Sequence, residues 1–228
     1  MFAGLKSMGL RGIDGFMVEV EADLSQGLPG FDVVGLPDAA VRESRDRVRA
    51  AMKNAGFTYP VSRITVNLAP ADVKKEGSVY DLPLLLALLC ASGQLKADMK
   101  KRAFIGELSL QGAVRPVRGV LPMVIAARDA GMKEVYVPAD NGEEAAVVEG
   151  IDVYPVTDIA KYHLPRYNDT NGKGACHGSF ETDSVQPRRK ISPYAAHRCG
   201  KTTVSERIRR RTFDQGCTRL HELSASGI

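Results

Sequence analysis

The chain has 228 residues and a formal net charge of +4. The charge is uneven: residues 1–160 hold 18 basic and 21 acidic residues, net −3, and residues 161–228 hold 13 and 6, net +7. No basic and then apolar leader is present, and no apolar run approaches the roughly 18 residues that a membrane span needs, so we expect a cytoplasmic protein with no membrane partner. Four scattered cysteines, with Cys90 in an apolar stretch, do not make a disulfide framework.

The N-terminal segment shows the period-two alternation of half-buried strands. Apolar side chains at Phe16, Val18 and Val20 alternate with acidic ones, which predicts a hairpin of two strands near 2–9 and 15–24. A short third strand over 31–34 and a helix over 38–54 are expected next.

The helix expected over 38–54 carries basic residues along one stripe, at Arg42, Arg45 and Arg49. Such a stripe could contact DNA or a neighbouring subunit, although a charged helix face is usually only solvated. Glu43 and Arg47 have the spacing of a stabilising pair on the same helix.

The stretch over 67–89 reads as the end of a strand, a polar loop and a helix. Lys74 and Lys75 are interpreted as solvated loop charges, and Asp81 as the N-cap that accepts the first free helix amides. From Leu82 to Ala91 the helix is apolar on every side, which predicts that it is buried.

The remaining pattern predicts a hairpin, with strands over 104–108 and 114–117, and then alternating helices and strands. These are expected over 121–131 (helix), 134–137 (strand), 141–148 (helix) and 153–156 (strand). The order βββαβαββαβαβ indicates an α/β fold of the α+β kind, a mixed sheet with hairpins and crossover helices. No G-x-G-x-x-G opens a helix, which disfavours a dinucleotide-binding fold.

Two segments, Gly27–Pro60 and Lys74–Leu89, resemble the N-terminal domain of the magnesium-chelatase-like AAA ATPases of the YifB/ComM family, and the resemblance runs over about 1–160. It implies a Lon-protease-like fold, shared with ribosomal protein S-five domain two. In full-length relatives an ATP-hydrolysing module follows, which implies ATP and magnesium as cofactors and a hexameric ring. The family is implicated in DNA processing, including branch migration during natural transformation.

The resemblance to Lon-type peptidases implies which two positions of this sequence correspond to their catalytic residues. Those enzymes use a serine within K-D-G-P-S-A-G and a lysine in the helix after a G-E-x-x-x-x-G hairpin. Alignment to these motifs puts Val79 at the nucleophile position and Leu121 at the base position. Valine has no nucleophilic oxygen and leucine cannot accept a proton, so the Ser–Lys mechanism has lost both partners. Ser78 is one residue away, and a residual peptidase stays an alternative.

The basic segment 161–228 is expected to be a poorly structured, truncated or frame-damaged remnant of the ATPase module. Its residues Gly200, Lys201 and Thr202 resemble the end of a phosphate-binding loop, but Ala195 stands where that motif needs glycine. A retained nucleotide site is therefore an alternative, and the cysteine and histidine spacings there fit no zinc module, so no metal site is expected. The leading interpretation is a noncatalytic domain for assembly and substrate contact.

Overall fold

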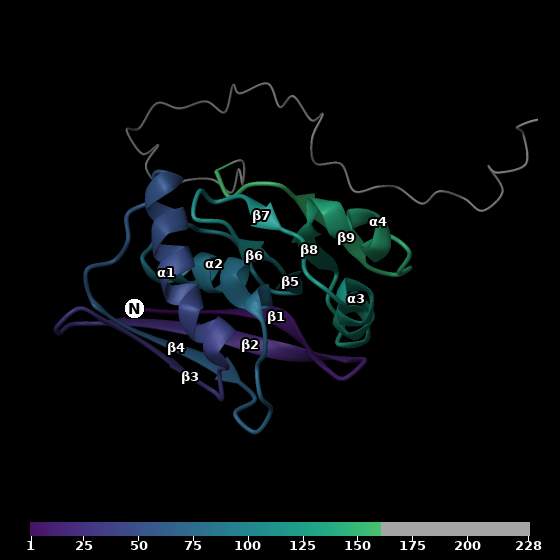
Figure 1. Cartoon of the computed structure of the whole chain (residues 1–228), viewed down its shortest axis with the longest axis horizontal. Coiled ribbons are helices and arrows are strands. Elements are labelled where there is room, and N and C mark those ends of the chain that lie inside the picture. The colour runs from purple at the N-terminus through teal and green to yellow at the C-terminus, as the bar shows by residue number, and fades with distance from the viewer. Residues whose placement is uncertain (161–228) are drawn as a thin grey trace, which may run out of the picture. The chain divides into compact units, whose positions relative to one another are not determined.

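A computed structural model of the chain describes residues 1–160. These residues form one seven-stranded sheet in the order β3-β4-β2-β1-β5-β8-β9, a separate two-stranded hairpin β6-β7, and four α-helices (Figure 1). The α/β class with a mixed sheet is therefore confirmed. The segment 161–228 lies outside the described residues.

The first four strands follow the predicted alternation closely. They are β1 (Phe2–Arg11), β2 (Asp14–Ser25), β3 (Gly30–Val34) and β4 (Arg63–Ala69). β2 runs antiparallel to β1 and β4, whereas β3 runs parallel to β4. Along β2 the buried residues Val18, Val20 and Ala22 alternate with acidic ones, so one face of this hairpin packs against the core and the other faces water.

The second half of the sheet is parallel, and here one prediction was wrong. The main-sheet strands are β5 (Arg102–Phe104), β8 (Glu134–Pro138) and β9 (Asp152–Val156), and the hairpin strands are β6 (Glu107–Leu108) and β7 (Val114–Arg115). The single strand expected over 104–108 is split between two sheets. The N–H of Ile105 donates to Tyr136 in the main sheet (2.9 Å), whereas the N–H of Gly106 donates to Val79 (3.0 Å), so the chain turns out of the sheet at this point.

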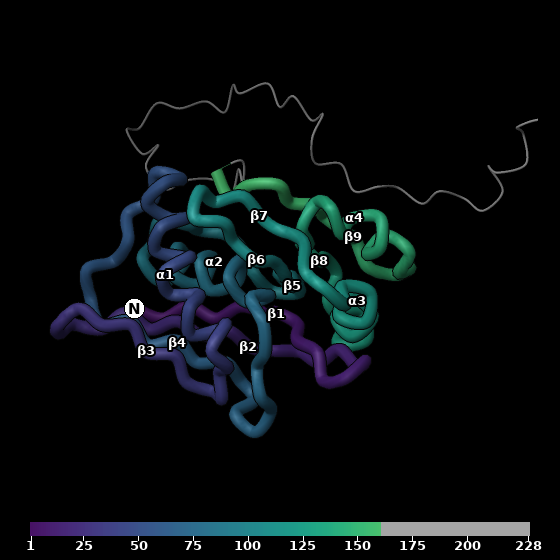
Figure 2. The backbone as a smooth tube through the Cα atoms, viewed as in Figure 1, coloured from purple at the N-terminus to yellow at the C-terminus, as the bar shows by residue number. Residues whose placement is uncertain are grey.

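The helices are α1 (Ala39–Asn54), α2 (Asp81–Ala91), α3 (Val120–Asp129) and α4 (Gly142–Ala145), with 3₁₀ turns η1 (Ser78–Tyr80) and η2 (Ala139–Asn141). Asp38 is the N-cap of α1, and its side chain accepts the N–H of Val41 (2.8 Å). α3 packs against the β1-β2 hairpin at Gly15, where a Cβ atom would lie 2.4 Å from the carbonyl oxygen of Pro122. The smooth trace in Figure 2 shows α1 and α2 along the same side of β1 to β4.

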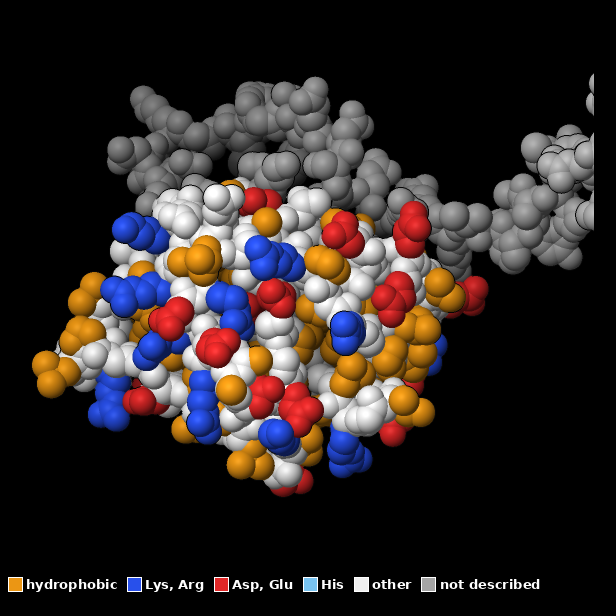
Figure 3. Space-filling view, in the orientation of Figure 1, with side chains coloured by type: hydrophobic (Ala, Val, Ile, Leu, Met, Phe, Trp, Pro, Cys, Tyr) orange, Lys and Arg blue, Asp and Glu red, His pale blue; other side chains and the backbone are white. Residues whose placement is uncertain are grey.

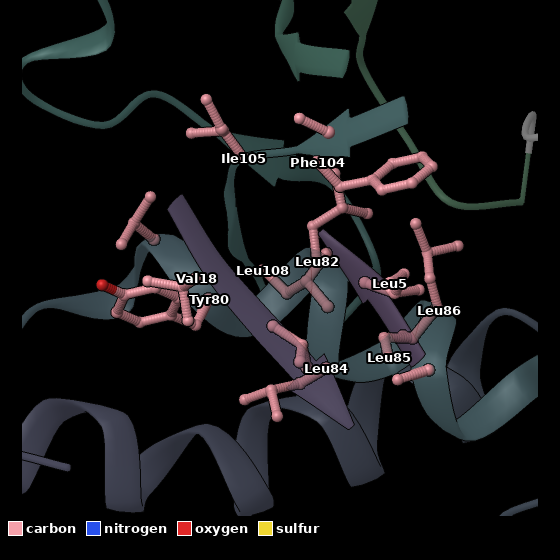
Figure 4. Packing of buried hydrophobic residues seen from close by; sticks show 14 of the residues in the cluster. Leu5, Val18, Tyr80, Leu82, Leu84, Leu85, Leu86, Phe104, Ile105 and Leu108 are labelled. Atoms are coloured by element: carbon pink, nitrogen blue, oxygen red, sulfur yellow. The ribbon is translucent and has the colours of Figure 1, made fainter. Parts of the chain in front are cut away.

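The core is built around α2, as its sequence predicts. Every residue from Asp81 to Leu89 is buried, and Figure 4 shows the leucines of α2 between β1 and β2 on one side and Phe104 and Leu108 on another. Each buried leucine contributes roughly 1.5–3 kcal/mol relative to an exposed one, so this helix is the largest single source of apolar burial in the described domain. Among residues 1–160, none of the helices combines the length and apolar character needed to cross a membrane.

Candidate functional site

The two segments that carry the family resemblance meet in space at the entrance to α2. The N–H of Lys75 donates to the carbonyl oxygen of Leu36 (3.1 Å), and the N–H of Asp38 donates to that of Lys75 (3.0 Å). The second oxygen of the Asp38 carboxylate accepts the N–H of Gly77 (3.0 Å). Asp38 therefore starts α1 and anchors the loop before α2 with one side chain.

Val79, at the nucleophile position of the Lon-type motif, lies in the 3₁₀ turn η1 that leads into α2. Its side chain is buried among apolar residues, and its carbonyl oxygen accepts the N–H of Gly106. A saturated side chain in this position offers no atom that could attack a carbonyl group.

Leu121, at the base position, lies in the first turn of α3. Its side chain is half-buried against the core, and its backbone N–H donates to the carboxylate of Glu144 (3.0 Å). Leucine has no group that titrates, so this helix supplies no general base at that position.

Ser78 is the serine next to position 79, and its partner is a carboxylate. Its Oγ donates to Glu107, in the hairpin strand β6, and Arg115 of the paired strand β7 lies 3.8 Å from the other Glu107 oxygen. The arrangement joins η1 to the hairpin. This group of Ser78, Glu107 and Arg115 contains no lysine, which a Ser–Lys mechanism requires as its base.

Lys75 is buried, so its interpretation as a solvated loop charge was wrong. The side chain is fully inaccessible, and its ammonium group donates to the carbonyl oxygens of Pro70 and Val73. Burial lowers the pKa of Lys75 from its usual range. Lys74 is exposed and paired with Glu76 (2.8 Å), as expected of a loop charge.

Asp81 was predicted to be the N-cap of α2, and this prediction was wrong as well. Tyr80 occupies the cap position, and Asp81 is the first helical residue. Its fully buried carboxylate accepts from the hydroxyl of Ser44, from Nε and Nη2 of Arg47 (2.6 and 3.1 Å) and from the N–H of Leu108 (3.1 Å). One carboxylate thus joins α1, α2 and β6.

Burial and Arg47 act on the charge of Asp81 in opposite directions. Burial raises the pKa of the Asp81 carboxyl, and the hydrogen bonds from Arg47 and Ser44 only partly offset this rise. The bond to Asp81 raises the pKa of Arg47, which is 20% exposed. The predicted pair of Arg47 with Glu43 is present at 3.6 Å, but the contacts with Asp81 are shorter and more buried. Ser44, Arg47 and Asp81 therefore all have hydrogen-bond partners within the fold.

The basic stripe lies on the outer side of α1. Arg42, Arg45 and Arg49 are all exposed, together with Lys53. Figure 3 shows Lys and Arg side chains over the region of α1, with acidic ones between them. Arg45 pairs with Asp46 (3.1 Å), and the guanidinium of Arg49 lies 5.5 Å from the ring centre of Tyr59.

The predicted nucleotide contacts Gly200, Lys201 and Thr202 lie outside the described residues. Within residues 1–160 the sequence contains no G-x-x-x-x-G-K-[ST] loop. The same part of the structure holds no group of three or more His, Cys, Asp or Glu residues placed to bind a metal ion.

Residues 20–141, more than half of the chain, match the family model described as subunit ChlI of Mg-chelatase. The chain belongs to the magnesium-chelatase ChlI-like family, in its YifB/ComM branch. A protein of Mycobacterium tuberculosis is 52% identical over 156 residues, which cover 68% of this chain and 31% of that protein. Competence protein ComM of Haemophilus influenzae is 46% identical over 149 residues, 65% of this chain and 29% of that protein.

The likeness to peptidases is weaker but is also present. Lon protease of Mycolicibacterium smegmatis is 29% identical over 166 residues, 67% of this chain and 21% of that protein. The chain spans about three-tenths of the length of the YifB/ComM relatives that it matches. The match with these relatives therefore concerns only part of their length, and activities of the whole relatives come to this chain only as proposals.

Sequence reasoning missed the buried junction of Ser44, Arg47 and Asp81. One signal was available: Ser44 and Arg47 lie in one of the two segments that carry the resemblance and Asp81 lies in the other, but nothing local showed that they bind each other. For Lys75 no signal was available, because the loop around it is charged and its acceptors are backbone carbonyl groups.

Proposed function

We propose that this chain supplies a noncatalytic Lon-like module that serves assembly and substrate contact in a DNA-processing ATPase of its family. One observation carries the proposal: valine and leucine stand at positions 79 and 121 within a well-packed site. The surrounding polar groups are engaged in holding α1, α2 and β6 together, which supports a structural use of the same elements.

The DNA-processing part of the proposal is drawn from the relatives. A competence protein is among them, and competence is the uptake of DNA. ATP, magnesium and a hexameric ring would belong to the complete relatives, and a cytoplasmic location is part of the same proposal.

A peptidase assay tests the noncatalytic role. The purified parent chain and its Ser78→Ala variant are each incubated with fluorogenic casein. Both proteins should give only the background rate, because no activated nucleophile is present. Turnover by the parent chain that Ser78→Ala abolishes would overturn the proposal in favour of a residual peptidase.

DNA contact through Arg42, Arg45 and Arg49 is tested by charge reversal. Fluorescence anisotropy of labelled branched DNA is followed at 50, 100 and 200 mM salt for the parent and for a variant with all three changed to Glu. Loss of three phosphate contacts should flatten the slope of log affinity against log salt by about 2.7.

The matched control reverses three exposed cations elsewhere in the described domain, Lys74, Lys100 and Arg118. If both triple variants lose affinity equally, the effect is one of net charge and the stripe is not the contact. If the stripe variant keeps the parent affinity, DNA does not bind there.

The nucleotide alternative has its own measurement. Fluorescence of a labelled ATP analogue is titrated with the full chain and with Lys201→Ala. A Lys201-dependent signal would favour a retained nucleotide site over the proposed noncatalytic role, and its absence would remove that alternative.

A further inference from the structure

Strand β3 leaves one of its edges unpaired in the described part of the chain. It is the first strand of the sheet and pairs only with β4 there, as its position at the margin in Figure 1 shows. The N–H of Gly30 donates toward β4, to Ser62 (3.4 Å), and strand residues alternate in the edge that they serve. The N–H and C=O groups of Phe31 and Val33 therefore point away from the sheet and are a template for another strand.

The opposite edge of the sheet is protected in two ways. β9 contains Pro155 in its second half, which removes a donor. The chain after β9 pairs with the hairpin: the N–H of Val114 donates to Thr157 (2.9 Å) and that of Ile159 to Gly112 (3.0 Å). β3 contains neither proline nor lysine, so its sequence does not block strand addition.

Exposed apolar side chains flank the open edge. Leu28 is 89% exposed, Val34 is 47% exposed and Leu36 is 55% exposed. Leu36 also has a positive φ of 55°, which is uncommon for a bulky residue. The bond from Lys75 to the Leu36 carbonyl, across the loop pairing described above, holds this conformation. An exposed leucine fixed in a costly backbone conformation points to a contact outside the domain.

The negative charge of Asp32, at the centre of β3, decides between a second copy of this chain and a partner segment as the strand that pairs with this edge. In the symmetric antiparallel pairing with a second copy that uses the full length of β3, Phe31 would pair with Val33 of the other copy, and Asp32 would face Asp32. Like charges directly opposite each other destabilise a strand pair. Asp32 is 57% exposed and lies 3.6 Å from Arg63, so a second cation on the other side would be accommodated on the same face.

We infer that the β3 edge binds an extended segment of a partner polypeptide by strand addition. The segment carries a lysine or arginine opposite Asp32 and apolar residues on the face that meets Phe31 and Val33. Main-chain hydrogen bonds would give the affinity, and the basic residue would set the register. This inference goes beyond the proposed function, because it needs neither DNA nor an ATPase module.

The probe is a fluorescein-labelled peptide, acetyl-Val-Thr-Val-Lys-Val-Thr-Val-amide, titrated with the full chain and followed by anisotropy. A matched peptide carries glutamate in place of the lysine. The lysine peptide should bind about fivefold or more tightly than the glutamate peptide, and Asp32→Lys should reverse the preference. Because Asp32 is exposed, circular dichroism should show that this variant folds as the parent does.

Two further peptides test the strand geometry without altering the protein. One is N-methylated at the odd positions and the other at the even positions. Only one set faces β3, so one peptide should lose binding about tenfold or more and the other should keep it, whichever direction the strand runs. Equal effects of the two methylation patterns would overturn strand addition.

A second copy as the occupant is also distinguishable. Analytical ultracentrifugation of the parent and of Asp32→Asn should show the same molar mass. Self-association that increases in Asp32→Asn, with no peptide binding by either protein, would replace the partner segment by a second copy and overturn the inference.

Discussion

Replacing Asp81 by alanine should destabilise the described domain more than any other single removal of a carboxylate. The carboxylate is fully buried and accepts from Ser44, Arg47 and Leu108. Its loss leaves the Arg47 guanidinium, which is mostly buried, without a counter-charge. Breaking a buried pair by removing one partner costs about 3–5 kcal/mol.

The measurement is urea unfolding followed by circular dichroism. For a slope of about 2 kcal/mol/M, a loss of about 4 kcal/mol moves the midpoint down by about 2 M. The matched control is Asp46→Ala on α1, which removes an exposed carboxylate paired only with its neighbour Arg45 and should cost about 0.5 kcal/mol or less.

A double variant separates the pair from simple packing. Arg47→Met together with Asp81→Ala leaves no uncompensated charge, so the two losses should add to less than the sum of the single variants. If Asp81→Ala costs no more than Asp46→Ala, or if the two changes are strictly additive, the junction is not the electrostatic joint described above.

Three further outcomes follow from the same structure. Burial lowers the pKa of Lys75 below its usual 10.5, so just below that pH the unfolded chain binds more protons than the folded chain. The free energy of unfolding of the parent, measured relative to that of Lys75→Met, should therefore rise with pH in this range. If urea titrations show that this difference does not change with pH, Lys75 is not buried. Gly35→Ala should destabilise strongly in thermal unfolding, because φ is +98° and the new Cβ would lie 2.1 Å from the carbonyl oxygen of Leu68, whereas a neutral effect would place that turn elsewhere. Asn141→Ala should cost about 1–3 kcal/mol in the same assay, because its amide pairs with both backbone groups of Val117 (3.0 and 3.1 Å), and an unchanged midpoint would refute this.

The strands and main helices could be predicted from the sequence because their cause is local. Alternation along β2 and β4 reports which face is buried, and an all-apolar run of the length of α2 has to be buried whatever lies around it. The split between β5 and β6 could not be predicted in this way. It depends on a bond from Ile105 to Tyr136, thirty-one positions further along the chain.

The assignment of positions 79 and 121 to the Lon-type nucleophile and base comes only from aligning the sequence to that motif, and it stays a prediction. What the polar residues do depends on distant partners: Asp81 reads locally as a helix cap, and only the packing of α1 brings Arg47 to it. A charged loop reads locally as solvated, and only its folding over Pro70 and Val73 buries Lys75.

These partners explain how a chain can resemble a peptidase motif and yet lack the peptidase groups. Asp38, Gly77 and Asp81 stand in the resembling segments because they fix the approach of α1 to α2, a task that does not involve position 79. The Val79 side chain is buried and packs in the core, whereas Asp81 holds Arg47 through charge-assisted hydrogen bonds. The resemblance therefore indicates which elements are held together.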